Sequence, residues 1–281
     1  MQKRVAAIHD ISCFGKCSLT VALPIISTAG IEVCVIPTAI LSTHTGGFSG
    51  FTYRDLTDDI GGIAGHWQTL PIHFDAVYTG FLGSVGQVDI VCDVFRQLRS
   101  FETLLIVDPV MADNGELYST FPPDFPKAMR RLCSKADIII PNMTEAALLL
   151  DEPYLKGPYG KAFVEDQLIR LSTLGPKHVV LTGVHFDDSH IGAAVYEQQT
   201  GIFEYAFSER IKGIYHGTGD VFASVLVAAT VHGLPLADAV KTAVEFTVQS
   251  IRRTHDAGTD PRFGINFEQS LPELMRRLSL L

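Results

Sequence analysis

Short runs of apolar, often β-branched residues recur along the 281-residue chain, and stretches with the apolar spacing of helices lie between them. The runs are RVAAIHD, EVCVIPTA, DAVYTG, TLLIVDP, DIIIPN, HVVLTG and IGAAVYE. Runs of this kind, each followed by Gly, Pro, Asn or Asp, are typical of central strands in a parallel sheet covered on both faces. We expect helices over residues 15–29, 54–69, 86–99, 123–134, 142–150, 161–173, 218–233 and 236–254. The alternation predicts a doubly wound α/β fold with a largely parallel sheet.

No shift in composition, internal repeat or low-complexity segment divides the chain, and its hydrophobic content of 47% can supply one large core. We therefore expect a single domain over residues 1–281. Two connections rich in Gly and Pro, residues 112–126 and 151–160, are predicted to be surface loops, and either can cover a ligand.

The formal net charge is −9, and no basic face is evident in the sequence. Nucleic acid is therefore an unsuitable partner, and small molecules are expected instead. The first apolar run is too short for a signal peptide, and no apolar stretch reaches the roughly 18–20 residues of a membrane span. Five scattered cysteines fit reduced thiols better than a disulfide framework, and Cys13 and Cys17 lack two further ligands at zinc spacing. We expect a cytoplasmic protein with no membrane partner.

Polar residues cluster where the predicted strands end, which in such sheets is the edge where ligands bind. These residues are Asp10, Ser12, Ser42, Thr43, His44, Thr45, Asp108, Asp113, Asn142, Glu145, Thr182 and Gly183.

The segment HGTGDVFAS places Gly217, Thr218 and Gly219 directly before Asp220 and a long apolar helix. The glycines allow backbone N–H groups to converge at the helix N-terminus, where they attract anions. A transferring phosphoryl group would be stabilised there, and the Asp220 carboxylate could accept the proton of an attacking hydroxyl. Alternatively, Asp220 only complements the helix dipole and the glycines only form a turn. The motif alone leaves both interpretations open.

Two further motifs also allow two interpretations. In DIIIPNMTEA, Asn142 and Glu145 lie on one face of a helix, where they could hold a hydrated Mg²⁺ or form a capping box. In LLIVDPVMAD, Asp108 and Asp113 could face one crevice and require a cation between them, or Asp113 could serve a turn. Neither a Walker A motif nor a Rossmann fingerprint is present, which argues against a P-loop enzyme and a dinucleotide oxidoreductase.

Several segments in order resemble the pyridoxal kinase family within the ribokinase-like vitamin kinases. They are AIHDIS, STHTGG, YTGFLGS, VDPVMAD, PNMTEA, VVLTG and HGTGDVFAS, and they span nearly the whole chain. The resemblance implies a ribokinase-like three-layer α/β/α sandwich. It also implies an ATP-dependent kinase that phosphorylates the 5′-hydroxymethyl group of a B6 vitamer (pyridoxal, pyridoxamine or pyridoxine).

Carried over by position, the resemblance makes Asp220 the base and the backbone of Gly217, Thr218 and Gly219 the anion hole. It assigns Mg²⁺ and the ATP phosphates to Asp108, Asn142 and Glu145, with Asp113 beside them, and the nucleotide to Thr182 and Gly183. It assigns the B6 substrate to Asp10, Ser12, His44, Thr45, Phe81 and Asp220. It further implies a homodimer, and it leaves open whether a monovalent cation such as K⁺ assists.

One position departs from the family pattern, because the best-known pyridoxal kinases carry Ser where this chain has Asp10. An aspartate there could favour a protonated ring nitrogen or an amine-bearing substrate. The nearest alternative is a hydroxymethylpyrimidine kinase of the same fold, many of which carry Cys in place of Asp220. A non-catalytic vitamin-binding protein is a further alternative, although it would have little reason to retain Asp220 beside an anion hole.

Overall fold

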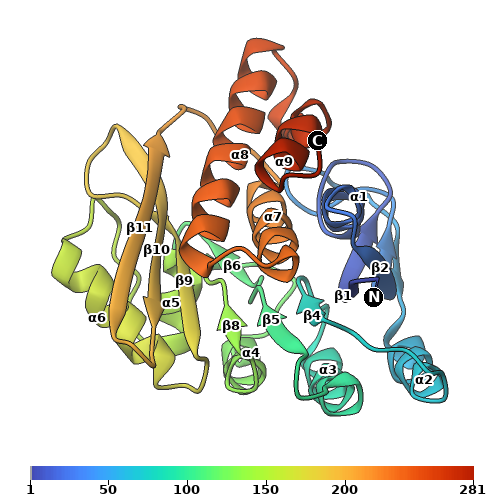
Figure 1. Cartoon of the computed structure of the whole chain (residues 1–281). Coiled ribbons are helices and arrows are strands. Elements are labelled where there is room, and N and C mark those ends of the chain that lie inside the picture. Colours follow the sequence, from blue (N-terminus) through green and yellow to red (C-terminus); the bar gives the residue numbers. More distant parts are fainter. Residues whose placement is uncertain (1) are drawn as a thin grey trace.

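The computed structural model describes residues 2–281, which are organised around a nine-stranded sheet with the order β11-β10-β9-β8-β5-β4-β1-β2-β3 (Figure 1). The central part is parallel and consists of β2 (Glu32–Leu41), β1 (Arg4–Ser12), β4 (Ala76–Thr79), β5 (Leu104–Val107), β8 (Ile138–Ile139) and β9 (His178–Val184). β10 (His190–Glu197) pairs with β9 in the antiparallel direction. All seven predicted strands are therefore present, and the mostly parallel sheet is confirmed.

The sequence analysis missed two strands at the edges of the sheet. β3 (Tyr53–Asp55) pairs antiparallel with β2, and β11 (Ile202–Glu209) pairs antiparallel with β10. Neither has the continuous apolar run by which we recognised the central strands, because an edge strand has a neighbour on one side only and remains partly exposed.

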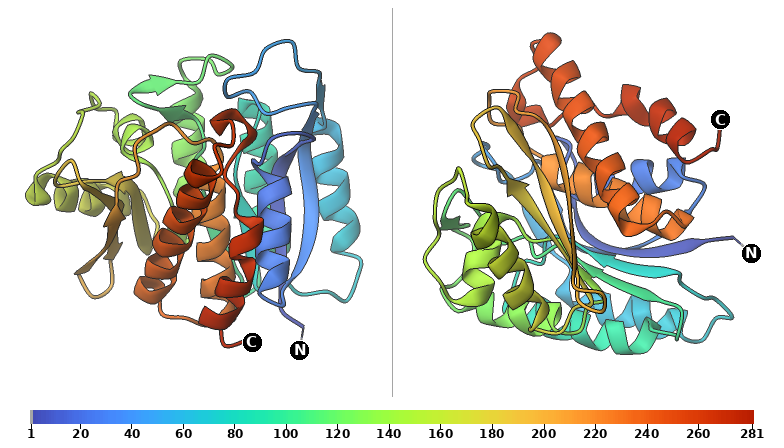
Figure 2. Two further views of the ribbon diagram at one scale, coloured as in Figure 1. Left: turned by 90° about the horizontal axis from the view of Figure 1, so that it is seen from above. Right: turned by 60° about the vertical axis from the view of Figure 1, so that its left-hand side comes forward.

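Helices cover both faces of the sheet, and the views in Figure 2 show the sheet between the two helical layers. One layer contains α2 (Thr57–Trp67), α3 (Val85–Leu98), α4 (Phe125–Cys133), α5 (Met143–Leu150) and α6 (Lys161–Ser172). The other contains α1 (Leu19–Thr28), α7 (Thr218–His232), α8 (Leu236–Asp256) and α9 (Leu271–Arg277). The eight predicted helices are all present, but α1 begins four residues later than predicted, and α9 was not predicted. Two 3₁₀ turns, η1 (Pro261–Phe263) and η2 (Glu268–Ser270), lie between α8 and α9.

Two apolar clusters form the core, one on each face of the sheet. In β5, Leu105 and Val107 pack into the cluster beneath α3 and α4, whereas Ile106 packs into the cluster beneath α7 and α8. Successive side chains of a strand point to opposite faces, so a strand covered on both faces must be apolar at every position. This requirement explains why the central strands read as unbroken apolar runs.

The connection over residues 112–126 is not the irregular loop that we predicted, because β6 (Ala112–Asp113) and β7 (Glu116–Leu117) form a short hairpin at its start. Asn114 and Gly115 make its two-residue turn with φ angles of 52° and 87°. An Asn-Gly pair suits such a turn because both positions require positive φ. The connection over residues 151–160 contains no helix or strand, as predicted.

All five cysteines are free thiols, in agreement with the expectation of no disulfide framework. None of the helices within residues 2–281 is both long enough and apolar enough to cross a membrane.

We predict that Phe95→Ala lowers the free energy of unfolding by about 3–5 kcal/mol, because Phe95 is almost fully buried between α3 and the sheet. Phe101→Ala is the matched control, since the Phe101 ring is fully exposed after α3. Urea unfolding followed by circular dichroism measures both variants. Equal effects of the two substitutions would contradict the core described here.

Candidate active site

The carboxylates predicted to carry chemistry lie at the carboxyl ends of the parallel strands. Asp10 is near the end of β1, Asp108 directly follows β5, and Glu145 lies in the first turn of α5, after β8. Asp220 lies in the first turn of α7. The negative charges of Glu145 and Asp220 both raise the pKa of Asp108. The charge of Asp10 likewise raises the pKa of Asp220. The four carboxylates therefore share one edge of the sheet, as the sequence predicted.

The backbone at the start of α7 requires a glycine at its N-cap. Gly217 has φ 74°, and a Cβ at this position would lie 2.0 Å from the carbonyl oxygen of Lys16. The absent side chain thus allows the segment after β1 to pack directly against the N-terminus of α7. A Cβ at Gly219, in contrast, would meet nothing within 4 Å. Space beside Gly219 is therefore open to a ligand that approaches the first backbone N–H groups of the helix.

Burial raises the pKa of the Asp220 carboxyl to about 7. The nearby backbone N–H of Ser18 lowers this pKa, and the charge of Asp10 raises it. A carboxyl group with a pKa near 7 can both take and release a proton at neutral pH, which is the property required of a general base.

Ser18 connects two of these carboxylates, and the sequence analysis did not select it. Its backbone N–H lowers the pKa of Asp220, and its side chain lowers that of Asp10, so Ser18 lies beside both carboxylates. Asp10 also accepts a hydrogen bond of 3.1 Å from Ser12 Oγ. Ser18 is the N-cap of α1 and has φ 52°. A serine before the apolar run LTVALPIIS is a helix-start signal that could have identified it, but we predicted that the helix begins at residue 15.

Asn142 and Glu145 form a capping box at the start of α5. Asn142 Oδ1 accepts hydrogen bonds from the backbone N–H groups of Thr144 (2.8 Å) and Glu145 (2.9 Å). Glu145 Oε2 accepts from the N–H of Asn142 (2.9 Å), and its Oε1 accepts from that of Met111 (3.1 Å). The capping interpretation is therefore confirmed. Burial raises the pKa of Glu145 to about 8, although these backbone hydrogen bonds oppose the rise.

Asp108 differs from Glu145 because, within residues 2–281, no hydrogen bond to its carboxylate is found. Burial, followed by the charges of Glu145 and Asp220, raises its pKa well above the ordinary value. No group of three or more His, Cys, Asp or Glu side chains in the described chain is arranged to hold a metal ion by itself. A buried carboxylate beside two others does fit a cation that arrives with phosphate and water ligands, as Mg²⁺ usually does.

The residues predicted to contact the nucleotide lie beside α5. Thr182 forms an isolated bridge with Asn142, and Gly183 follows it with φ 72° and open space where a Cβ would be. Asp113 lies in the exposed β6–β7 hairpin, where its carboxylate accepts hydrogen bonds from the backbone (2.8 Å) and side chain (2.9 Å) of Asn114. The turn role considered for Asp113 is therefore present in the structure.

The predicted substrate segment after β2 contacts the segment after β1, where a Cβ on Gly15 would lie 2.3 Å from the His44 ring, and the segment after α8. Gly46 N–H donates to His44 Nδ1 at 3.1 Å, so the other ring nitrogen, Nε2, carries the proton and donates to the Arg262 carbonyl at 2.6 Å. Both His44 nitrogens are thus bonded to protein, and burial lowers the pKa of the ring. Thr45 is exposed beside it, whereas half-buried Phe81, after β4, packs against Phe121.

Aromatic side chains from distant segments join Phe48, which shares a segment with His44, around the His44 ring. The ring of Phe48 lies 4.9 Å from that of His44, and the ring of His216 lies 5.3 Å from it. Phe263 packs against the half-exposed ring of Phe14 at 5.1 Å. Phe14, His216 and Phe263 come from segments far from His44 in the chain, so no local pattern could have grouped them with it.

Known proteins resemble this chain over most of its length. A family model described as phosphomethylpyrimidine kinase matches residues 26–263. The hydroxymethylpyrimidine/phosphomethylpyrimidine kinase of Mycobacterium tuberculosis is 25% identical over 91% of this chain and 90% of its own. The pyridoxal kinase of Dictyostelium discoideum is 26% identical over 92% of this chain and 88% of its own.

Solved structures share the fold. A Bacteroides thetaiotaomicron protein described as a phosphomethylpyrimidine kinase, crystallised with pyridoxal, has a TM-score of 0.93 and 40% identity, covering 98% of this chain and 96% of that one. Pyridoxal kinase from Lactobacillus plantarum has a TM-score of 0.88 and 33% identity, covering 98% and 97%. The fold is thus the ribokinase-like α/β/α sandwich of the pyridoxal kinases, and this chain belongs to the phosphomethylpyrimidine kinase family of vitamin kinases.

Proposed function

We propose that this protein is an ATP-dependent pyridoxal kinase, which transfers the γ-phosphoryl group to the 5′-hydroxymethyl group of a B6 vitamer. The proposal rests on the position and the pKa of Asp220. Its carboxyl group lies in the first turn of α7 and has a pKa near 7. Asp220 directly follows Gly219, where a Cβ would meet nothing within 4 Å, at the N-terminus of the helix.

In the proposed reaction, Asp220 accepts the proton of the 5′-hydroxyl as its oxygen attacks the γ-phosphorus. The oxygen–phosphorus bond to ADP breaks as the new one forms, so the products are the 5′-phosphate and ADP. The N–H groups at the start of α7 stabilise the negative charge on the transferring group. The nearby backbone N–H of Ser18 favours the ionised form of Asp220, and the partial burial of the site strengthens each of these interactions.

Magnesium, bound with the nucleotide, would add positive charge beside the phosphate oxygens, and Asp108 is the side chain best suited to hold it. Glu145 and Asn142 would contribute mainly by fixing the start of α5, since their oxygens already accept backbone hydrogen bonds. We propose that Thr182 and Gly183 line the nucleotide site beside them.

The nearest alternative is a hydroxymethylpyrimidine or phosphomethylpyrimidine kinase. The family model and the Mycobacterium relative favour it, whereas the Bacteroides protein that was crystallised with pyridoxal favours the B6 assignment. Asp220 also supports the B6 assignment, because many hydroxymethylpyrimidine kinases carry Cys in place of this aspartate.

We expect Asp220→Asn to lower kcat by roughly 10²–10⁴-fold while substrate binding persists, because the amide keeps the shape of the site but cannot take a proton. Steady-state ADP release measures kcat, and calorimetry measures binding. Asp58→Asn is the matched control, since Asp58 is an exposed carboxylate in the first turn of α2. Turnover of Asp220→Asn close to wild type would refute the assignment of the base.

The stability of the ligand-free protein should report the pKa of Asp220. Burial raises this pKa to about 7 in the folded state, against an ordinary value of 3.8. Between these values the folded protein holds a proton that the unfolded chain has lost, so Asp220 makes the fold less stable as pH rises. Asp220→Asn should leave the free energy of unfolding nearly unchanged at pH 4 and raise it at pH 8, with an upper bound of about 4 kcal/mol.

Urea unfolding at the two pH values measures this difference. Asp260→Asn is a control of opposite sign, because a hydrogen bond from Arg262 lowers the pKa of Asp260 to about 2. That variant should be no more stable than wild type at pH 8. If Asp220→Asn has the same effect at both pH values, the raised pKa of Asp220 is wrong.

Substrate choice is tested by comparing kcat/KM for pyridoxal, pyridoxamine, pyridoxine and the hydroxymethyl aminopyrimidine. We expect a B6 vitamer to be the best substrate. Asp10→Ser should lower kcat/KM for pyridoxamine relative to pyridoxal by roughly tenfold, because it removes a buried carboxylate that we propose contacts the amine. A higher kcat/KM for the pyrimidine than for every vitamer would instead establish the alternative function.

A further inference from the structure

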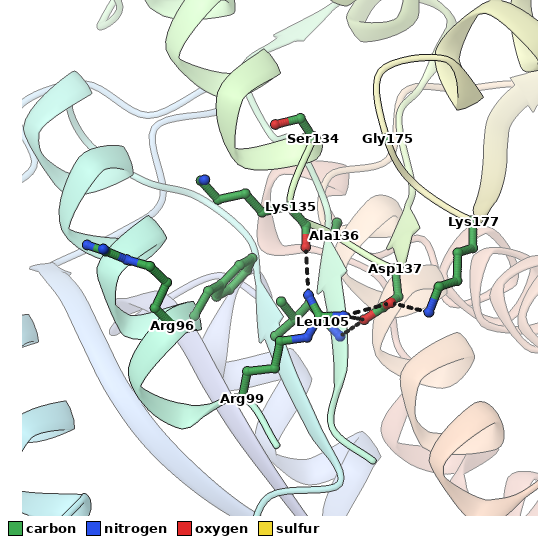
Figure 3. Close-up of a pocket in the computed structure, with 10 residues that line it drawn as sticks. Arg96, Arg99, Leu105, Ser134, Lys135, Ala136, Asp137, Gly175 and Lys177 are labelled. Carbon is green, nitrogen blue, oxygen red and sulfur yellow. Dashed lines mark hydrogen bonds and ion pairs between the residues drawn. The ribbon is translucent and has the colours of Figure 1, made fainter. Parts of the chain in front are cut away.

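Two buried carboxylates at opposite edges of the sheet differ in the donors that surround them. Asp137 directly precedes β8, and its carboxylate accepts hydrogen bonds from Arg99 (3.2 Å), Lys177 (3.0 Å) and the backbone N–H of Leu105 (3.0 Å). Figure 3 shows the side chains of Arg99 and Lys177 reaching Asp137 from two sides. Asp108 directly follows β5 and is buried to a similar extent, but its carboxylate accepts no hydrogen bond within residues 2–281. Because buried polar groups normally have a partner, a donor for Asp108 is expected among the side chains around it.

Tyr78 is the candidate donor, and its position follows from the register of the sheet. Tyr78 in β4 pairs with Ile106 in β5, and both pack into the apolar cluster on the α7 side. Because side chains alternate along a strand, Asp108, two residues beyond Ile106, returns to the same face. The Asp108 N–H donates to the Thr79 carbonyl at 3.0 Å, which continues the pairing past the end of β5. Tyr78 and Asp108 are therefore diagonal neighbours on one face, with Cα atoms roughly 8 Å apart.

The Tyr78 hydroxyl is fully buried and has no hydrogen-bond partner in the described chain. Burial raises the pKa of Tyr78 well above its ordinary value, and the charges of Asp108 and Asp220 raise it further, so the side chain lies near both carboxylates. Asp220 already has the backbone N–H of Ser18 beside it, whereas Asp108 has no such donor. A phenol has one O–H to donate, and leaving it buried without an acceptor is costly. The hydroxyl and the Asp108 carboxylate thus supply what the other lacks.

Two neutral side chains, His9 and Ser224, lie beside Tyr78 and also have no hydrogen-bond partner in the described residues. The His9 ring meets that of Tyr78 edge-on at 4.4 Å, and burial lowers the pKa of His9 to about 3, so the ring carries no charge. Ser224 lies one turn after Asp220 in α7, and its side chain lowers the pKa of Tyr78. An ionised carboxylate accepts a stronger hydrogen bond than either neutral group. Asp108 is therefore the preferred acceptor for the Tyr78 hydroxyl.

The ring of Tyr78 is held in place from the β1 side. His9 lies two residues beyond Ala7, the partner of Tyr78 in β1, and so points to the same face of the sheet. A Cβ at Gly80 would lie 2.4 Å from His9 Nδ1, so the absent side chain of Gly80 makes room for the imidazole. His9 thus fills the space on one side of Tyr78, and Asp108 lies on the other.

We propose that Tyr78 is a positioning residue, whose hydroxyl donates a hydrogen bond to one oxygen of Asp108 and leaves the other oxygen to Mg²⁺. The role assigned to Tyr78 rests on the proposed function, in which Asp108 holds the cation that arrives with the nucleotide. Carboxylates that ligate metals are in turn hydrogen-bonded by neighbouring groups, and loss of such a neighbour typically costs 10–100-fold in metal affinity or activity. The Tyr78 hydroxyl has no partner in the structure, so the bond forms when the cation orients the carboxylate.

The test measures how Mg²⁺ changes the Kd of a non-hydrolysable ATP analogue, by calorimetry with and without the metal. The ratio of the two Kd values reports the contribution of the cation and requires no turnover. Tyr78→Phe removes only the hydroxyl, so it should lower this ratio by roughly tenfold and leave the Kd without metal unchanged. Tyr196→Phe is the matched control, because Tyr196 is half-buried in β10 and pairs with Val179 near the start of β9, away from the site. It should keep the wild-type ratio.

A double-mutant cycle with Asp108→Asn separates positioning from a structural role. Asp108→Asn should itself lower the ratio, and adding Tyr78→Phe should then have no further effect, because the hydroxyl acts through Asp108. Tyr78→Phe alone should leave the ligand-free protein at least as stable as wild type in urea unfolding, because its hydroxyl has no partner there. Lower stability with an unchanged Kd ratio would show that the hydroxyl has only a structural role.

The role of Tyr78 is wrong if Tyr78→Phe keeps the wild-type ratio, if it lowers the ratio equally in the Asp108→Asn background, or if Tyr196→Phe lowers it as much. These outcomes leave the proposed kinase activity standing, since turnover of the B6 vitamers by the wild type measures that activity separately. If Mg²⁺ does not change the Kd of the wild type, the assignment of the cation to Asp108 is wrong, and the role of Tyr78 is wrong with it.

Discussion

Crowding of buried carboxylates at one edge of the sheet is the constraint on which the rest of the site depends. Asp10, Asp108, Glu145 and Asp220 each have a pKa raised mainly by burial, and several raise one another's. Such an arrangement opposes folding at neutral pH, so a protein has reason to keep it only where chemistry uses it. A cation that arrives with a ligand relieves the repulsion among these carboxylates. A proton that one of the carboxylates takes from a ligand has the same effect.

The fold keeps these groups in place through close backbone contacts. The missing side chain of Gly217 lets the carbonyl of Lys16 approach the start of α7, and the backbone N–H of Ser18 lowers the pKa of Asp220 there. Lys16 N–H also donates to the Phe263 carbonyl at 3.1 Å, which joins the segment after α8 to the same region. Three segments distant in sequence thus meet beside the Asp220 carboxylate. The opposite edge of the sheet has the contrary charge balance, because Asp137 gathers cations there.

Much of the fold and part of the site could be predicted because their signals are local. The unbroken apolar runs identified the central strands, and the order of motifs placed Asp10, Asp108 and Asp220 at one edge. The hairpin at residues 112–117 and the edge strands β3 and β11 were not predicted, because short or half-buried strands lack such runs. The role of Ser18 and most of the aromatic contacts around His44 were not predicted, because the residues in contact lie far apart in the sequence.

The sequence by itself determined the alternation of strands and helices, and the position of a GTGD turn before an apolar helix, because side-chain periodicity and glycine conformations are local properties. Only the tertiary structure decided that Asn142 and Glu145 cap α5, that both His44 nitrogens are bonded to protein, and that Asp108 has a carboxylate free of hydrogen bonds in the described chain. It also decided the pKa values, because desolvation and charge repulsion depend on which groups are brought together from distant parts of the chain.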